Sequence, residues 1–168
     1  MVILVDRYDN PVGSAPKLET HERGLLHRAV SVLLFNGRDE LLIQRRAAGK
    51  YHSGGLWANT CCGHPSPGES CMSAAARRLR EELGLAAALN PLRTFIYRAR
   101  LDRGMQEYEL DHVFVGRSDR MPVPDPEEVS DFRYLPMPQI REEMLLHPGR
   151  YAVWFRIMVC GFEKGVTG

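Results

Sequence analysis

The segment from Glu69 to Leu83 constrains the fold most, because its sequence, ESCMSAAARRLREEL, is dense in residues that favour the α-helix. Gly84 follows directly, at the position where glycine commonly ends a helix in the left-handed conformation. On both sides of this segment the chain forms short apolar runs separated by turn residues. The sequence therefore predicts a helix over 69–83 set among β-strands.

The short apolar runs have the composition and spacing of strands. MVILV before DNPVG predicts a strand and turn, and AVSVLLF, followed by NG and ELLIQR, predicts a hairpin. TFIYRARL and YELDHVFVGR, separated by DRGMQE, predict two further strands, and FRYL predicts another. Residues 138–146 and 152–163 carry helical apolar spacing and are separated by HPGR. The expected class is α/β in the α+β sense, with short, mostly antiparallel connections and no repeated βαβ unit.

Composition indicates the size of the folded unit and limits its partners. The 168 residues, 44% of them hydrophobic, are expected to form one domain over 1–168. A formal net charge of +1 offers no broad positive field for nucleic acid or an anionic membrane, so any anion site must be local. No apolar run approaches the roughly 18 residues of a membrane span, and MVILVDRYDNPVG has no basic leader. We therefore expect a cytoplasmic protein that acts on a small molecule, with a monomer as the default.

The cysteines have no spacing typical of disulfides or of structural zinc, so reduced thiols are expected at Cys61, Cys62, Cys71 and Cys160. Cys61 and Cys62 are adjacent and stand just before His64 and a Pro/Gly turn. From these residues alone, the cluster could ligate a metal, act on a substrate or fill a core. Alternation along an extended segment would turn Cys61 away from whatever Cys62 faces, so Cys61 is expected to pack.

Carboxylates and imidazoles form a candidate metal site. Glu107 and Glu109 are two positions apart in a predicted strand, so both side chains share one face. Taken alone, this pair is typical of an exposed strand face. Three histidines can join it if the fold brings them together: His21, His27 and His64. Such a mixed nitrogen and oxygen shell would suit Mn²⁺, Zn²⁺ or, less well, Mg²⁺.

The spacing of the histidines along the chain matches no regular secondary structure. His21 and His27 are six positions apart, which matches neither a helix face nor a strand face, so a loop is expected to position them. The remaining three, His52, His112 and His147, are expected to be surface or turn histidines.

Cationic and aromatic side chains form a third set of candidate functional residues. Arg78 and Glu82 lie four apart on one face of the predicted helix, which alone is typical of a solvated surface. The helix follows GHPSPG, whose glycines allow close approach of a ligand, and a carboxylate there can hold Mg²⁺ bridged to phosphate. Cations brought together would bind a diphosphate; the candidates are Lys17, Arg45, Arg46, Lys50, Arg77 and Arg78. Tyr97 and Trp154 offer aromatic faces, which usually fill a core but also stabilise a cation.

These residues, in this order, resemble the type 1 isopentenyl diphosphate isomerases of the Nudix superfamily. The resemblance runs from Lys17 to Cys160 and is carried by KLETHERGLLHRA, LLIQRRAAGKYHSGGLWANTCCGHPSPGES, AAARRLREELG, YRARLDRGMQEYE and Trp154. It implies a Nudix-type α/β sandwich of mixed or antiparallel sheets with flanking helices. It also implies isomerisation of isopentenyl diphosphate to dimethylallyl diphosphate through a tertiary carbocation, in isoprenoid biosynthesis.

The same resemblance implies roles for particular residues. Cys62 would be one acid/base residue, and Glu109, with Tyr97 beside it, would act on the opposite face of the substrate. The metal ligands would be His21, His27, His64, Glu107 and Glu109. Glu82 would hold a second Mg²⁺ on the diphosphate. The diphosphate would contact Lys17, Arg46, Lys50 and Arg78, and Trp154 would face the hydrocarbon.

The predicted helix departs from the hydrolase form of the Nudix pattern. Arg78 stands where the first helix glutamate is expected, so a cation replaces a metal-binding carboxylate, which weakens a hydrolase interpretation. Two alternatives to the isomerase stay open. One is a Nudix pyrophosphohydrolase acting on a nucleoside diphosphate derivative, and the other is a metal-stabilised binding module whose folding depends on the metal.

Overall fold

The computed structural model describes residues 1–163, and within them nine strands pair into one mixed sheet. The strands are β1 (Val2–Val5), β2 (Pro11–Ala15), β3 (His27–Phe35), β4 (Glu40–Arg46), β5 (Trp57–Ala58), β6 (Cys61–Gly63), β7 (Leu89–Arg100), β8 (Gln106–Arg117) and β9 (Val129–Pro136). The helices are α1 (Lys17–Arg23), α2 (Cys71–Leu83), α3 (Met137–Leu146) and α4 (Val153–Glu163), with single 3₁₀ turns at Asp102–Gly104 and Pro148–Arg150.

Strand β3 connects most of the sheet. It pairs antiparallel with β1, β4 and β6, and parallel with β8 over the whole run from His27 opposite Glu109 to Phe35 opposite Arg117. The other strand pairings are antiparallel, as expected, and this central parallel pair makes the sheet mixed. The chain between β3 and β8 is long and contains α2, which gives it the length that a parallel crossover requires.

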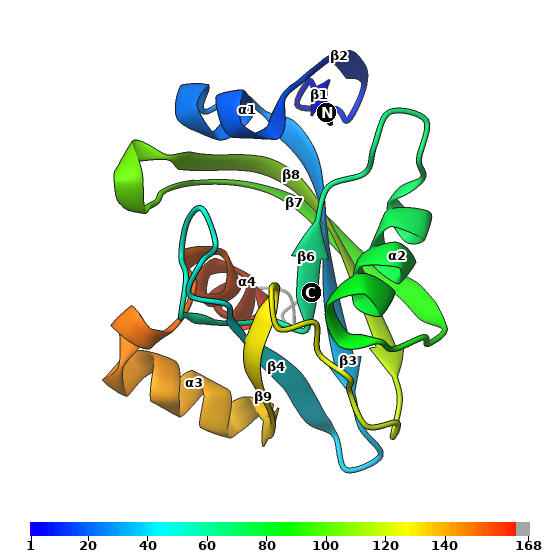
Figure 1. The fold of residues 1–168 in the computed structure, drawn as a ribbon, viewed down its shortest axis with the longest axis vertical. Coiled ribbons are helices and arrows are strands. Elements are labelled where there is room, and N and C mark those ends of the chain that lie inside the picture. Colours follow the sequence, from blue (N-terminus) through cyan, green and yellow to red (C-terminus); the bar gives the residue numbers. More distant parts are fainter. Residues whose placement is uncertain (164–168) are drawn as a thin grey trace.

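The two faces of β3 bury different helices. Val30, Val32 and Leu34 pack in one cluster with Leu79 and Leu83 of α2. Leu33, on the opposite face, packs in a second cluster with side chains of the C-terminal helices: Ile140 of α3 and Phe155 and Met158 of α4. Since successive strand residues point to opposite faces, one apolar strand supports both layers. The result is the expected sandwich, with α2 on one side of the sheet and α3 and α4 on the other (Figure 1).

Helix α2 confirms the predicted helix over 69–83, although it begins two residues later. Ser70 is the N-cap, and its hydroxyl accepts a hydrogen bond from the backbone N–H of Ser73 (3.1 Å). Glu69 therefore lies before the helix, where its carboxylate binds Arg77 (2.8 Å). Gly84 ends α2 in the left-handed conformation with φ of 64°, as its sequence position predicts.

The predicted hairpin at Asn36 and Gly37 is present, but its strands soon separate. β3 and β4 pair only at Phe35 and Leu41. Beyond that point β6 takes the edge of β3, placing Cys62 opposite Ser31, while β9 pairs along β4. The separation of the two strands lets the segment that carries Cys62 enter the sheet.

The other predicted strands and helices are confirmed with longer or shifted bounds. TFIYRARL and YELDHVFVGR form the β7–β8 hairpin, FRYL lies in β9, and the two C-terminal patterns form α3 and α4. Helix α1 was not predicted. It ends at Gly24, which is left-handed (φ 61°), and it lies above the β7–β8 hairpin in Figure 1.

The predicted domain and the absence of a membrane span can be compared with the structure only over the described residues. The predicted domain extends to residue 168, and its residues 164–168 lie outside the described part. In the described part, no helix is both long enough and apolar enough to cross a membrane.

A substitution at Gly63 tests how closely α2 packs on β6. A Cβ atom at Gly63 would lie 2.5 Å from Cγ of Arg78, whereas one at Gly13 would meet nothing within 4 Å. We expect Gly63→Ala to lower the free energy of unfolding by about 1–3 kcal/mol, since the Arg78 side chain must move. Gly13→Ala, also in a strand, is the matched control. Equal urea midpoints for the two variants would contradict this packing.

Candidate active site

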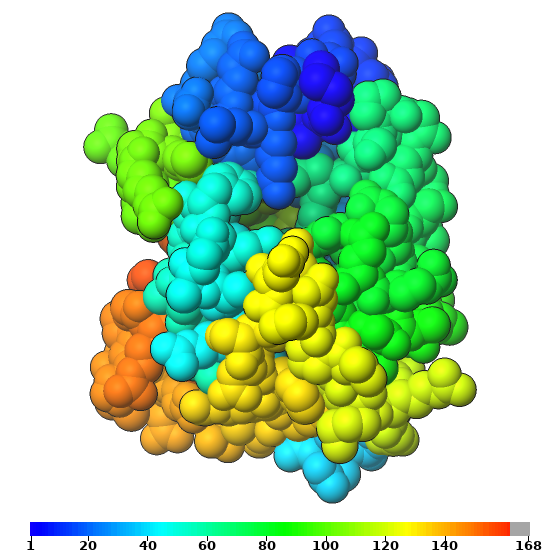
Figure 2. Space-filling view, in the orientation of Figure 1, coloured from blue at the N-terminus to red at the C-terminus, as the bar shows by residue number. Residues whose placement is uncertain are grey.

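One pocket gathers most of the residues that the sequence singled out. Figure 2 shows the surface hollowed where the N-terminal segment, the loop after β4, α2 and the segment before β9 meet. The pocket is lined by eleven of the predicted residues, namely Lys17, Arg46, Lys50, Cys62, His64, Arg78, Glu82, Tyr97, Glu107, Glu109 and Trp154. The other two, His21 and His27, are fully buried beside it.

Hydrogen bonds to the backbone determine which ring nitrogens of two histidines can bind a metal. Nδ1–H of His21 donates to the carbonyl of Lys17 (2.7 Å), and Nδ1–H of His27 donates to the carbonyl of Leu25 (2.8 Å). Because a carbonyl oxygen only accepts, each Nε2 carries a lone pair. Burial lowers the pKa of His21, and it lowers the pKa of His64 to about 3. Neutral imidazoles of this kind are the form that ligates metals.

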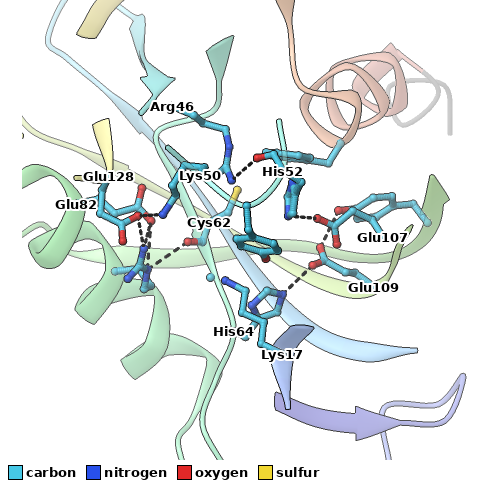
Figure 3. Close-up of a pocket in the computed structure, with 15 residues that line it drawn as sticks. Lys17, Arg46, Lys50, His52, Cys62, His64, Glu82, Glu107, Glu109 and Glu128 are labelled. Atoms are coloured by element: carbon cyan, nitrogen blue, oxygen red, sulfur yellow. Dashed lines mark hydrogen bonds and ion pairs between the residues drawn. The ribbon is translucent and has the colours of Figure 1, made fainter. Parts of the chain in front are cut away.

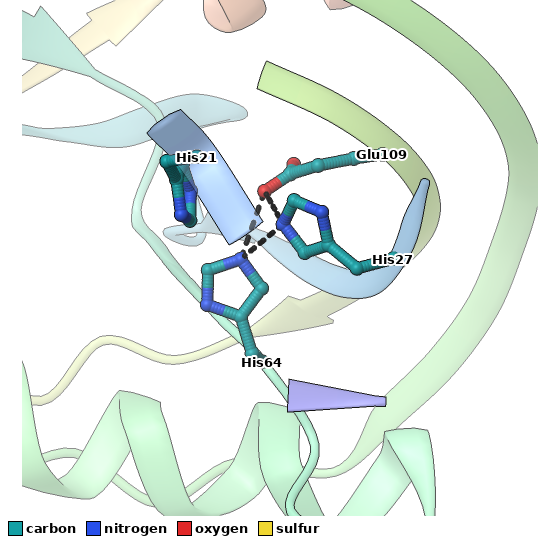
Figure 4. A group of neighbouring side chains, drawn as sticks. All are labelled: His21, His27, His64 and Glu109. Carbon is teal, nitrogen blue, oxygen red and sulfur yellow. Dashed lines mark hydrogen bonds and ion pairs between the residues drawn. The ribbon is translucent and has the colours of Figure 1, made fainter. Parts of the chain in front are cut away.

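The ligand atoms have the spacing of neighbours around one ion (Figure 4). Nε2 of His27 lies 3.2 Å from Nε2 of His64 and 3.3 Å from Oε1 of Glu109, and the last two atoms are 2.9 Å apart. Bonds of about 2.1 Å place adjacent ligands of a six-coordinate ion about 3 Å apart. The observed distances therefore fit a bound cation.

Glu107 joins this group through His21. Its Oε2 lies 3.2 Å from Nε2 of His21, and neither buried atom has a hydrogen-bond partner. A lone pair facing a carboxylate oxygen cannot form a hydrogen bond, but a shared cation would satisfy both atoms. The four atoms from His21, His27, His64 and Glu109 lie within 4.8 Å of one another, and Glu107 forms a second such group with His21 and His52. The predicted five residues are thus brought together.

The structure corrects the expectation for His52. It was expected at the surface or in a turn, but only 3% of it is exposed and its Nε2 lies 3.4 Å from Oε1 of Glu107. The loop after β4 folds tightly back, since a Cβ at Gly54 would lie 2.5 Å from the carbonyl oxygen of Ala48. The GG in the sequence was the available signal. His147 is exposed, as expected, whereas His112 lies half-buried within β8, beside Asp9.

The sequence predicted that a loop positions His21 and His27. The turn at Gly24 lies between them, but it is only part of what places the two rings. His21 belongs to helix α1, and His27 is the first residue of β3. The turn at Gly24 connects a helix end to a strand start, and each element holds one ring.

The two carboxylates differ in their ease of ionisation. Burial and the nearby charge of Glu109 raise the pKa of Glu107 well above its usual value. Burial also opposes ionisation of Glu109, but without a metal the rings of His27 and His64, when protonated on the Nε2 that faces Oε1, hold its pKa well below the usual value. Tyr97 donates its hydroxyl to Oε2 of Glu109 (2.7 Å), and burial keeps that phenol protonated by raising its pKa. A divalent cation would offset the repulsion between the two carboxylates.

Cys62 points into the pocket and Cys61 does not, which confirms the predicted alternation. Cys61 is 1% exposed and packs in the core beneath α2. The Cys62 thiol donates to Oδ1 of Asn59 (3.2 Å) and lies 3.5 Å from the hydroxyl of Ser31. Burial and the charge of Asp111 raise the pKa of Cys62 to about 12. The thiol is therefore protonated at neutral pH.

Asn59 is a site residue that the sequence did not reveal. Its Nδ2 donates to the carbonyls of Val32 (3.2 Å) and Cys61 (3.0 Å), so Oδ1 faces two pocket-lining residues, Cys62 and Trp154. There Oδ1 accepts from both Cys62 and Nε1 of Trp154 (3.3 Å). One buried amide thus positions the thiol relative to the indole. A lone asparagine in WANTC has no distinguishing pattern.

Asp111 was also missed, although a signal was present. It continues the alternation of Glu107 and Glu109 by one further step along β8. Asp111 is 1% exposed and accepts a hydrogen bond from Ser31 (2.8 Å). Burial and the charge of Glu109 raise its pKa to about 8.

The opposite end of the pocket is cationic. In Figure 3 Glu82 and Glu128 lie on one side of Cys62, and Glu107 and Glu109 lie on the other. Partial desolvation and the charges of neighbouring cations lower the pKa of Lys17; those cations are Arg78, Lys50 and Arg46. Such mutual repulsion indicates a site for an anion with several charges.

Two carboxylates hold these cations in place. Nη2 of Arg78 donates to Glu82 (2.6 Å) and to Glu128 (3.1 Å), and Lys50 also binds Glu128. Gln44 donates to the other oxygen of Glu82. Glu128 was not predicted, because it lies far from α2 in the sequence and no sequence pattern indicates that it contacts Arg78. Arg77 and Arg45 are directed elsewhere, Arg77 to Glu69 and Arg45 to the carbonyl of Gly55.

Comparisons with known proteins agree with this arrangement. A family model described as the NUDIX domain matches residues 25–155. The isopentenyl-diphosphate Delta-isomerase of Pectobacterium atrosepticum is 49% identical over 156 residues, covering 93% of this chain and 87% of that protein. The isopentenyl-diphosphate Delta-isomerase 2 of Photorhabdus laumondii is 47% identical over 163 residues, covering 97% and 92%.

Solved structures show the same fold. A crystal structure of a Deinococcus radiodurans protein has a TM-score of 0.72 at 22% identity, covering 87% of this chain and 89% of that one. The MutT protein from Methanosarcina mazei has a TM-score of 0.68 at 19% identity, covering 85% and 96%. These matches confirm the expected sandwich of sheet and helices.

Metal-dependent stability tests the His and Glu group. We expect Mn²⁺ added to chelator-treated protein to raise Tm, because an ion at 100 times its Kd stabilises the folded state by about 2.7 kcal/mol. His27→Gln should remove most of this shift, whereas His147→Gln, at an exposed position, should retain it. Equal shifts in both variants, measured by calorimetry, would place the ion elsewhere.

Proposed function

This chain belongs to the Nudix-domain isopentenyl-diphosphate delta-isomerases, and from that membership we propose how its pocket moves the double bond of isopentenyl diphosphate to give dimethylallyl diphosphate. One observation carries the proposal. Cys62 on β6 and the hydrogen-bonded pair of Glu109 and Tyr97 on β8 and β7 line the same pocket, between a cationic end and a group of potential metal ligands.

The cationic end binds the diphosphate. Lys17, Arg46, Lys50 and Arg78 supply the charges, with arginine forks suited to two phosphate oxygens and lysines acting as point charges. Glu82 is the residue that would hold a Mg²⁺ on the diphosphate, where the ion would neutralise part of its charge. In the structure Glu82 is bound by Arg78 and Gln44, so it is already oriented toward this end.

The hydrocarbon end exchanges protons. Addition of a proton to the terminal alkene carbon gives a tertiary carbocation, and loss of a proton from the carbon on the diphosphate side gives the new double bond. The thiol of Cys62 and the Glu109–Tyr97 pair supply one group for each transfer. After turnover the proton has moved from one group to the other, and exchange with solvent restores the starting state.

The surroundings protect the cation. Trp154 is 5% exposed and presents its ring to the pocket, and an aromatic face stabilises a cation by about 0.5–2 kcal/mol. Asn59 holds the indole by its N–H, so the ring cannot turn its edge inward without losing that bond. Low exposure of the lining also keeps water away from the carbocation.

The group of His21, His27, His64, Glu107 and Glu109 would hold Mn²⁺, Mg²⁺ or Zn²⁺. The bound ion would fix the Glu109 carboxylate and tune its acidity. The binding-module alternative is weakened, because in the described residues neither candidate metal group contains a cysteine, which leaves Cys62 free for chemistry. The hydrolase alternative is weakened by Arg78, which occupies a carboxylate position and is paired with Glu82.

The bacterial relatives and the small-molecule pocket also support a cytoplasmic location. We assign a monomer as the working unit, because the lining of the pocket is complete within one chain.

The activity is tested by proton and phosphorus NMR of isopentenyl diphosphate with the protein and Mg²⁺ in deuterated water. We expect the dimethylallyl isomer to appear with solvent deuterium incorporated and both phosphates still attached. Release of phosphate or diphosphate without that isomer would contradict the proposal and favour hydrolysis. An unchanged spectrum with metal restored would favour the binding module.

The neighbouring cysteines provide a matched pair of variants. We expect Cys62→Ala to lower kcat by about 10²–10⁴-fold or more, the usual contribution of an acid/base group, with diphosphate affinity almost unchanged. Cys61→Ala should leave kcat near the wild-type value and cost about 1 kcal/mol of stability, since its side chain is buried under α2. Rates by NMR and affinity by calorimetry distinguish the two. Full activity of Cys62→Ala would refute its assigned role.

A further inference from the structure

His52 is buried in the pocket wall, and its surroundings hold the ring in one orientation. Its ring lies 5.6 Å from that of His21 and 5.8 Å from that of Trp154, measured between centroids. Hydrogen bonds hold the backbone of its loop at His52 and at Ser53. Arg46 donates to the carbonyl of His52 (3.2 Å), and the N–H of Ser53 donates to Asp102 (2.9 Å). The ring is therefore placed by packing and by backbone hydrogen bonds together.

His52 and His21 divide the two oxygens of Glu107 between them. Nε2 of His52 lies 3.4 Å from Oε1, and Nε2 of His21 lies 3.2 Å from Oε2. Oε2 is fully buried and lacks a hydrogen-bond partner, as does Nε2 of His21. Oε2 is thus the oxygen available to a cation, and Oε1 is the oxygen that faces His52.

The geometry does not favour His52 as a ligand itself. Its Nε2 faces Oε1 of Glu107 (3.4 Å), whereas Oε2, the oxygen that faces His21, is the one available to an ion shared with His21. A second ion held by His52 and Glu107 would need the lone pair of His21, which the first group already uses. A donor role for His52 avoids this conflict.

Glu109 provides an internal comparison. Its Oε1 faces the imidazoles of His27 and His64, while its Oε2 accepts a hydrogen bond from Tyr97 (2.7 Å). Glu107 has the same division, with one oxygen toward the histidine group and the other toward a buried donor. Partners of this kind fix the orientation of metal ligands, and losing one commonly weakens metal binding about 10–100-fold.

We propose that His52 is a positioning residue for Glu107, donating its Nε2–H to Oε1 and so directing Oε2 to the metal shared with His21. In this tautomer the hydroxyl of Ser53, 3.2 Å from Nδ1 of His52, is the donor to that nitrogen. This role rests on the metal centre of the proposed function, and the experiment below separates the two.

The test compares Mn²⁺ binding in three variants. His52→Phe keeps a ring in the packed position and removes the donor, His52→Gln supplies an amide N–H in place of the ring N–H, and His147→Gln is the exposed control. Titration of chelator-treated protein should give a Kd for Mn²⁺ raised about 10–100-fold in His52→Phe. His52→Gln and the control should stay close to wild type. Circular dichroism of the metal-free proteins checks that each variant is folded.

Pulsed EPR on the Mn²⁺-loaded proteins distinguishes a positioning residue from a ligand. The number of imidazole nitrogens bound to Mn²⁺ should be the same in wild type and both His52 variants. Loss of one coupled nitrogen in both would overturn the proposal by making His52 a ligand. An unchanged Kd in a folded His52→Phe would also overturn it. Failure of the wild-type chain to bind Mn²⁺ would overturn the metal centre itself, whatever the isomerase assay shows, and this role with it.

Discussion

The parallel pairing of β3 with β8 is the constraint on which the pocket depends. Its register sets His27 opposite Glu109, while the pairing of β3 with β6 sets Ser31 opposite Cys62. The β7–β8 pairing sets Tyr97 opposite Glu109. Because side chains alternate between faces, a slip of one residue in β3 or β8 would turn these groups to the other side of the sheet. The apolar residues between them, buried against α2 and the C-terminal helices, make such a slip costly.

The sheet therefore performs two tasks with one alternating pattern. Val30, Val32 and Leu34 of β3 anchor α2, and through it place Arg78 and Glu82 at the cationic end of the pocket. The intervening residue Ser31 is directed to the other face, toward Cys62. A change in β3 that disturbs packing against α2 is therefore expected to move the pocket residues as well.

The two ends of the pocket accommodate buried ionisable groups differently, and only the cationic end pairs opposite charges. Lys50 and Arg78 are held by Glu128 and Glu82, so the cations are compensated before any diphosphate arrives. Glu107 and Glu109 face imidazoles, a phenol and each other, and among the described residues no lysine or arginine pairs with either carboxylate. Buried charge without a partner is expensive, which is the physical reason that this end suits a bound cation.

Local sequence patterns determined much of this protein. Helix α2 and its glycine end, the strand pattern of β8 and the opposite directions of Cys61 and Cys62 all follow from propensities and periodicities that act over a few residues. Only the tertiary structure decided that β3 and β8 run parallel, that the loop after β4 buries His52, that Glu128 lines the pocket, and that Asn59 binds Cys62 and Trp154. Those contacts join residues far apart in the chain, or turn a polar loop residue inward. Their free energy comes from packing and hydrogen bonds that exist only once the sheet has formed, so a local pattern such as the GG after His52 marks a tight loop but not what the loop buries.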